Sequence, residues 1–146
     1  MMPNPIRYLL GLFRGKPRER RRAPRYDARH QFSVSLIGKA DGPEDVQKPQ
    51  TLVGHTRNVS ETGFALVVPS LRLGTRKLND REATLRIMLD LPSETVEIHA
   101  APVRSYQLPE DDKDKGWYFI AARITQLSDD ARAQFTKYLR SLRAPH

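Results

Sequence analysis

The sequence predicts an all-β domain in which six or seven short antiparallel strands close into a barrel or sandwich, with a helix at the C-terminus. A chain of 146 residues can bury one hydrophobic core. Several short segments alternate apolar and polar residues. Eight glycines and eleven prolines provide many turns. Short strands that share one core must form a closed or doubled sheet to bury their apolar faces.

The composition is that of a globular protein with a strongly basic surface. Hydrophobic residues make up 38% and charged residues 29% of the chain, and the formal net charge is +8. Such a surface attracts phosphates, acidic proteins or anionic lipid. The chain has no cysteine, which excludes disulfides and thiolate metal sites, and its apolar run near the start is too short to span a membrane. We therefore expect a cytoplasmic protein.

The strand segments follow one another at short intervals along the chain. Phe32, Val34 and Leu36 alternate with serines, which is the two-residue period of a half-buried strand. By the same reasoning, strands are expected at residues 32–36, 51–55, 64–68, 85–91, 96–100, 103–108 and 117–124. Residues 92–94 form the turn of one hairpin, and the acidic residues 109–116 form the turn of a second. Residues 38–50 form a long surface loop.

Two helices are expected outside the strands, one at each end of the chain. A short amphipathic helix and a basic linker make up residues 1–19. The apolar face of this helix consists of Ile6, Leu9, Leu10 and Phe13. It could dock on its own domain, on a partner protein, or peripherally in the headgroup layer of an anionic membrane. The second helix follows Ser128, a good N-cap, and completes a domain of residues 20–143. Phe135, Leu139 and Leu142 form its apolar stripe.

The inventory of reactive residues favours a binding protein over an enzyme. The histidines are His30, His55, His99 and His146. They lie on separate segments without the spacing of a metal site, and we expect them to face solvent or lie in turns. The acidic pairs Asp80/Glu82 and Asp111/Asp112 fall in loops, where charge usually means solvation. No nucleophile elbow or phosphate-binding glycine loop is present, so we expect no catalysis, cofactor or metal.

The first candidate binding element is a run of arginines just before the first strand. It consists of Arg20, Arg21, Arg22 and Arg25. Arg21 and Arg25 are four residues apart, so in an extended chain they can share a side and hold one ligand. A guanidinium binds phosphate through two hydrogen bonds, pairs with guanine O6 and N7, and stacks on a base. The run alone also fits a solvated tail or an arm that binds nucleic acid nonspecifically.

The second candidate element is Asn58-Val59-Ser60-Glu61-Thr62-Gly63, a turn between two apolar strands. Asn58 and Ser60 alternate toward the same side, and their side chains either close the turn on its own backbone or reach a ligand. Gly63 supplies either a positive φ or a close backbone approach. Taken alone, the segment fits an ordinary loop equally well.

Together, the two elements resemble the PilZ domain family, whose signature is RxxxR followed, after one or two strands, by [D/N]xSxxG. Here the first motif is Arg21-Arg22-Ala23-Pro24-Arg25 and the second is Asn58-Val59-Ser60-Glu61-Thr62-Gly63. Arg18/Arg22 and Arg25/Arg29 also satisfy RxxxR. The Arg21/Arg25 register is preferred because residues 26–29 look like the start of the first strand. The resemblance covers residues 20–142 and implies a six-stranded antiparallel barrel with a C-terminal helix.

The resemblance also implies a bacterial receptor for cyclic di-GMP, a second messenger with two guanines and two phosphodiesters. The ligand-binding residues it implies are Arg21 and Arg25, with Arg22 as a helper, and Asn58, Ser60 and Gly63. We expect the arginine segment to fold over the ligand and to signal to a downstream protein partner, with no specific DNA or RNA ligand. Two alternatives stay open, namely a PilZ-fold docking module that binds no nucleotide and a nonspecific nucleic-acid binder.

Overall fold

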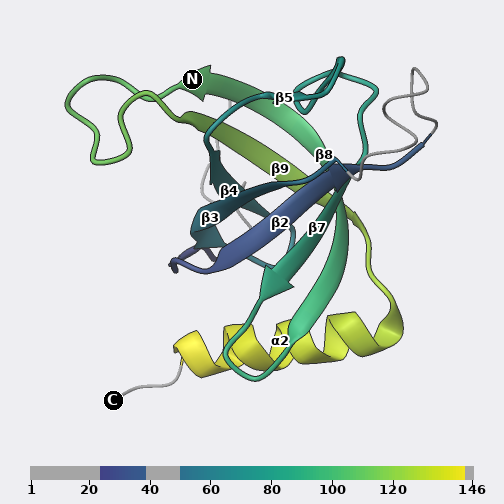
Figure 1. Ribbon diagram of the computed structural model, residues 1–146. Coiled ribbons are helices and arrows are strands. Elements are labelled where there is room, and N and C mark those ends of the chain that lie inside the picture. Colours follow the sequence, from purple (N-terminus) through teal and green to yellow (C-terminus); the bar gives the residue numbers. More distant parts are fainter. Residues whose placement is uncertain (1–23, 39–49, 144–146) are drawn as a thin grey trace, which may run out of the picture.

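A closed antiparallel barrel forms the centre of the protein in a computed structural model that describes residues 24–38 and 50–143. Its strands are β2 (Gln31–Leu36), β3 (Leu52–Val59), β4 (Gly63–Val68), β7 (Leu85–Asp90), β8 (Thr95–Gln107) and β9 (Tyr118–Gln126). Around the barrel their order is β3-β2-β7-β8-β9-β4, and the pairing of β3 with β4 closes it (Figure 1). The expected six-stranded antiparallel barrel is therefore confirmed.

Three further short strands of the described residues lie outside this ring. Strand β1 (Tyr26–Asp27) pairs with the end of β3, so that Tyr26 lies opposite Val59 and Asp27 opposite Asn58. Strands β5 (Arg72–Leu73) and β6 (Arg76–Lys77) form a separate small hairpin, which the apolar periodicity did not indicate.

Strand β8 differs most from the sequence-based expectation. The segments 96–100 and 103–108, expected as two strands, form one strand of 13 residues that pairs with both β7 and β9. The register of β8 against β9 shifts between His99 and Ala100 and again between Pro102 and Arg104. Such irregularities bend a strand around a barrel and interrupt its alternation of faces, which is why the sequence suggests two strands.

The barrel interior is filled by the inward-facing residues of every strand. Phe32, Ile87 and Ile120 are at most 1% exposed and belong to one continuous cluster of buried side chains. A smaller cluster lies apart from this core, and its buried members are Ala65, Val67, Leu108 and Phe119. Ala65 and Val67 alternate along β4 with core residues, so the second cluster lies on the outer face of the sheet.

Helix α2 (Asp129–Arg143) lies across one end of the barrel (Figure 1). It begins where expected, because Ser128 Oγ accepts a hydrogen bond from the amide of Ala131 at 3.0 Å and caps the helix. Phe135 and Leu139 are buried, and the ring of Phe135 meets that of Phe64 edge-on at 6.4 Å. The predicted C-terminal helix and its apolar stripe are therefore confirmed.

The N-terminal helix, Arg20 to Arg22 and most of the loop at residues 38–50 lie outside the described residues. Within the two stretches that are described, no helix is long and apolar enough to cross a membrane.

Candidate functional site

The turn between β3 and β4 is shorter than the motif that contains it. Asn58 and Val59 still belong to β3, and Gly63 is the first residue of β4. Ser60 closes the turn, since its Oγ accepts hydrogen bonds from the amides of Thr62 and Gly63 at 3.3 and 3.2 Å. The amide of Ser60 also donates to the carbonyl oxygen of Gly63 at 2.8 Å. The Ser60 side chain therefore closes the turn on its own backbone.

Asn58 behaves differently from Ser60. It pairs with Ala65 of β4, so its side chain lies on the outer face of the barrel. Its Oδ1 is buried and accepts no hydrogen bond from the part of the chain that the structure describes. An unsatisfied buried acceptor costs about 1–3 kcal/mol, so Asn58 carries an acceptor that the described part of the barrel leaves unused.

Gly63 allows a close approach between two strands. It is absent from the glycines with positive φ, which are Gly38, Gly74 and Gly116 in the described segments. A Cβ built on Gly63 would overlap the carbonyl oxygen of Ala122 in β9. Of the two roles considered for this glycine, the structure shows the close approach, and its partner is the barrel backbone.

Strand β1 brings Arg25, the last residue of the arginine run, close to the turn. Arg25 is exposed and directly precedes β1, whose Tyr26 and Asp27 lie opposite Val59 and Asn58. The antiparallel register therefore continues from Arg25 toward Ser60. Hydrogen bonds hold the following segment to the same strand, because Thr56 Oγ1 donates to the carbonyl of Ala28 at 2.7 Å. Arg21 and Arg22 lie outside the described residues.

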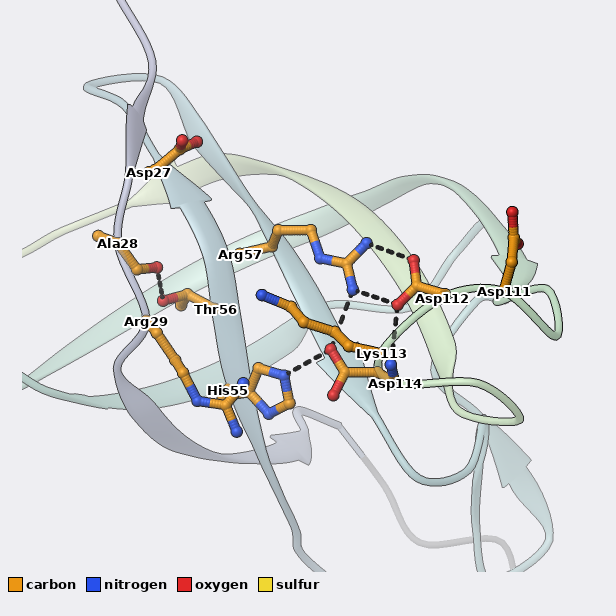
Figure 2. A pocket seen from close by; sticks show the side chains of 10 residues that line it. All are labelled: Asp27, Ala28, Arg29, His55, Thr56, Arg57, Asp111, Asp112, Lys113 and Asp114. Atoms are coloured by element: carbon orange, nitrogen blue, oxygen red, sulfur yellow. Dashed lines mark hydrogen bonds and ion pairs between the residues drawn. The ribbon is translucent and has the colours of Figure 1, made fainter.

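A cavity of about 660 Å³ opens beside these residues, between the β1 segment, β3 and the acidic loop, which is the β8–β9 connection at residues 109–116 (Figure 2). It is lined by Asp27, Ala28, Arg29, His55, Thr56, Arg57, Asp111, Asp112, Lys113 and Asp114. Its volume lies within the usual range of small-molecule sites. The sequence did not indicate this cavity, because the acidic loop and β3 are more than 50 residues apart.

Arg57 fastens the acidic loop to the barrel. Its guanidinium donates to both carboxylate oxygens of Asp112, at 3.0 and 2.8 Å, and to Asp114 at 2.9 Å. These hydrogen bonds are visible in Figure 2. They hold the pKa of Asp112 below its ordinary value and, led by the bond to Asp112, raise the pKa of Arg57. The wall of the cavity is thus a pre-formed ion-pair network.

His55 completes this network. It is 9% exposed, its Nε2 lies 3.2 Å from Asp114 Oδ2, and its ring faces Trp117 with 5.7 Å between the ring centres. Burial raises the pKa of Asp114, but the hydrogen bonds from His55 and Arg57 outweigh it and leave the pKa below its ordinary value. The Asp114 carboxylate therefore stays ionised at neutral pH.

Two expectations about charged and titratable residues are wrong. His55 lies buried in β3, and half-buried His30 bonds through Nε2 to the hydroxyl of Tyr138, so neither simply faces solvent. Asp112 belongs to the ion-pair network and is not merely solvated. Residue spacing could not show these contacts, because each joins segments distant in sequence. Among the described residues no group of three or more acidic or histidine side chains is placed to hold a metal ion.

Solved structures share this fold. The structure of the Bacillus subtilis inhibitor of motility MotI (DgrA) superposes with a TM-score of 0.58 at 18% identity, covering 89% of this chain and 57% of MotI. The PilZ domain of Escherichia coli YcgR, solved with c-di-GMP, gives 0.57 at 15% identity, covering 85% of this chain and 92% of that domain. The K. pneumonia MrkH complex with c-di-GMP gives 0.59 at 19% identity, covering 84% of this chain and 51% of MrkH.

These likenesses define the fold class. The protein has a PilZ-like β-barrel with one C-terminal helix, and it spans little more than half the length of MotI and MrkH. By description, MotI is an inhibitor of motility and MrkH is a c-di-GMP-dependent transcription regulatory factor. No protein-family model and no curated protein sequence matches the chain.

Proposed function

We propose that this protein is a receptor for cyclic di-GMP. The observation that carries the proposal is the pairing of β1 with the end of β3, which brings Arg25 close to the Asn58 turn. The proposed ligand-binding residues are Arg21, Arg22, Arg25, Asn58, Ser60 and Gly63. The YcgR and MrkH structures, which have the same fold and contain c-di-GMP, support the choice of ligand.

The proposed roles follow from the chemistry of each group. A ligand with two phosphodiesters needs cations, and a guanidinium binds phosphate or a guanine edge through paired hydrogen bonds. Arg25 with Arg21 supplies these forks, with Arg22 assisting. Asn58 offers the buried Oδ1 to a guanine N–H donor. Ser60 and Gly63 contribute by fixing the turn that presents Asn58.

A ligand held in this way would act as a switch. Closure of the arginine segment on a dianion neutralises repulsion between its cations, so ligand binding changes the position of the chain that precedes β1. A downstream protein would read that change, and the protein itself would be a receptor or adaptor without catalysis.

Isothermal titration calorimetry with cyclic di-GMP tests the proposal. Losing a charge-assisted hydrogen bond costs roughly 1.5–3 kcal/mol, so Arg25→Ala should weaken binding at least about tenfold. Asn58→Ala should also weaken it. Arg86→Ala is the matched control, because Arg86 is an exposed β7 arginine paired with Glu97 and its loss changes the net charge equally. Equal affinity of Arg25→Ala and the unaltered protein would refute this site.

The same titration separates the alternatives. A docking module with this fold would show no heat of binding and no thermal stabilisation by the ligand. A nonspecific nucleic-acid binder would take up any oligonucleotide, with an affinity that falls steeply as salt rises.

A further inference from the structure

The cavity beside β1 is lined in part by charged side chains that form no hydrogen bond or ion pair within the described residues. Arg57, His55, Asp112 and Asp114 satisfy one another. Within the described part of the chain, the side chains of Asp27, Arg29 and Lys113 line the cavity and make no hydrogen bond or ion pair. Figure 2 shows Arg29 extending from the chain after β1 and Lys113 from the acidic loop, with Asp27 at the edge of the cavity. These groups are available to a ligand.

The charge of the cavity indicates which part of a nucleotide it suits. Four carboxylates line it, at Asp27, Asp111, Asp112 and Asp114, against three permanent cations at Arg29, Arg57 and Lys113. A phosphate gains little from such surroundings, whereas a neutral base with hydrogen-bond donors gains acceptors. Guanine fits this description, because its Watson–Crick edge carries an N–H and an amino group side by side and a carboxylate can accept from both.

Asp27 is the carboxylate in the best position. It lies opposite Asn58 in the β1–β3 pair and two residues after Arg25, so a ligand held by those residues reaches it directly. Asp112 and Asp114 are already engaged by Arg57. Resting on the proposed function, we propose that the cavity is a guanine subsite in which the Asp27 carboxylate reads the Watson–Crick edge of one base of cyclic di-GMP.

This subsite would make Asp27 a specificity residue. Adenine presents an acceptor nitrogen at the position of the guanine N1–H and lacks the neighbouring amino group. A carboxylate that binds guanine therefore repels adenine, and a site built around such a hydrogen bond rejects the analogue that lacks it. Arg29 and Lys113 at the same cavity would offer donors to guanine O6 and N7.

The direction in which Asp27→Asn changes the affinity for cyclic di-GMP distinguishes the subsite from a general effect of charge. By long-range electrostatics alone, removal of a negative charge should strengthen binding of an anionic ligand. If the carboxylate reads guanine, calorimetry should show cyclic di-GMP binding weakened about tenfold or more, and the preference over cyclic di-AMP should shrink. Asp130→Asn, an equal charge change in the first turn of α2, should leave both affinities unchanged. Circular dichroism checks that the variants fold.

Unchanged or tighter binding of cyclic di-GMP by Asp27→Asn would overturn the subsite and leave the proposed function standing. Equal weakening by Asp130→Asn would also overturn it, because the effect would then not depend on the position of Asp27. Failure of the unaltered protein to bind cyclic di-GMP would overturn the proposed function, and the subsite with it.

Discussion

The motif residues of the β3–β4 turn have distinct roles. Ser60 holds the turn through its Oγ, Gly63 lets β4 approach β9, and Asn58 leaves a buried acceptor without a partner. A loss of ligand affinity on changing Ser60 or Gly63 would therefore report on the turn as much as on a ligand contact. Asn58 is the more informative position for binding experiments.

Gly63→Ala should destabilise the barrel. The new methyl group would overlap the Ala122 carbonyl, so β4 and β9 would have to move apart, and overpacking of this kind costs roughly 1–3 kcal/mol. Gly116→Asn is the control, because Gly116 has a φ of 85° and open space around it, and Asn tolerates this conformation. Urea denaturation measures both, and equal stability of Gly63→Ala and the unaltered protein would contradict the account.

Arg57→Ala should release the acidic loop. Asp112 and Asp114 would lose their cation, and trypsin should then cut after Lys113 and Lys115 several-fold faster, as mass spectrometry of the fragments would show. Arg86→Ala, which breaks an exposed ion pair elsewhere, should leave that cleavage rate unchanged. If both variants are cut at the same rate as the unaltered protein, Arg57 does not hold the loop.

At the scale of single residues, the sequence predicts which residues form the motifs but not which side chains surround them. Asn58, Ser60, Gly63 and Arg25 were identified by type and spacing, and the β1–β3 pairing places them together. The cavity was missed because it depends on Arg57 meeting a loop far along the chain. Local periodicity carries no information about such contacts.

At the scale of elements, alternation located the barrel strands well and their ends less well. Strand β3 extends through Val59, because its pairing with β4 continues past a register shift between Thr56 and Asn58. The sequence predicts two strands where the structure has the single strand β8, because bulges interrupt the two-residue period without ending the pairing. The prediction of helix α2 was closer to the structure, because the N-cap Ser128 and the apolar stripe with Phe135 and Leu139 both indicate a helix over the same residues.

Ser128→Ala should destabilise the protein by about 1 kcal/mol through loss of the helix cap. Its hydroxyl bonds the amide of Ala131 at 3.0 Å. Ser141→Ala is the matched control inside the same helix, where the exposed hydroxyl donates to the carbonyl of Tyr138 and alanine is a good helix former. Chemical denaturation that finds both serines equally dispensable would argue against the cap.

The contact between His30 and Tyr138 joins the barrel to α2 and should make stability depend on pH. Burial lowers the pKa of His30 from its ordinary value of 6.5. The unfolded chain then binds a proton first on acidification, so stability is lost as pH falls below about 6.5 toward the lowered pKa.

Melting curves between pH 7.5 and 5.5 measure this effect. His30→Gln should flatten the pH dependence of the melting temperature. A His30→Gln curve with the original slope would show that another group causes the loss.

For the whole molecule, the closed barrel and the net charge of +8 have separate consequences. Closure removes free strand edges and gives a rigid outer face for a site. The positive charge draws anions toward that face from a distance, while base recognition depends on the few groups near Asn58. A ligand at about a hundred times its dissociation constant should raise the stability by roughly 2.7 kcal/mol, far more than a nonspecific anion at the same concentration.

The central claim, that cyclic di-GMP binds where β1 meets the Asn58 turn, is tested most directly by amide chemical shifts of the labelled protein during a titration with the ligand. We predict that the amides of Asp27, Asn58, Ser60 and Gly63 shift in a saturable way, whereas those of the β5–β6 hairpin keep their positions and linear GMP moves neither set. Saturable shifts confined to other surfaces, or no shifts at all, would contradict it.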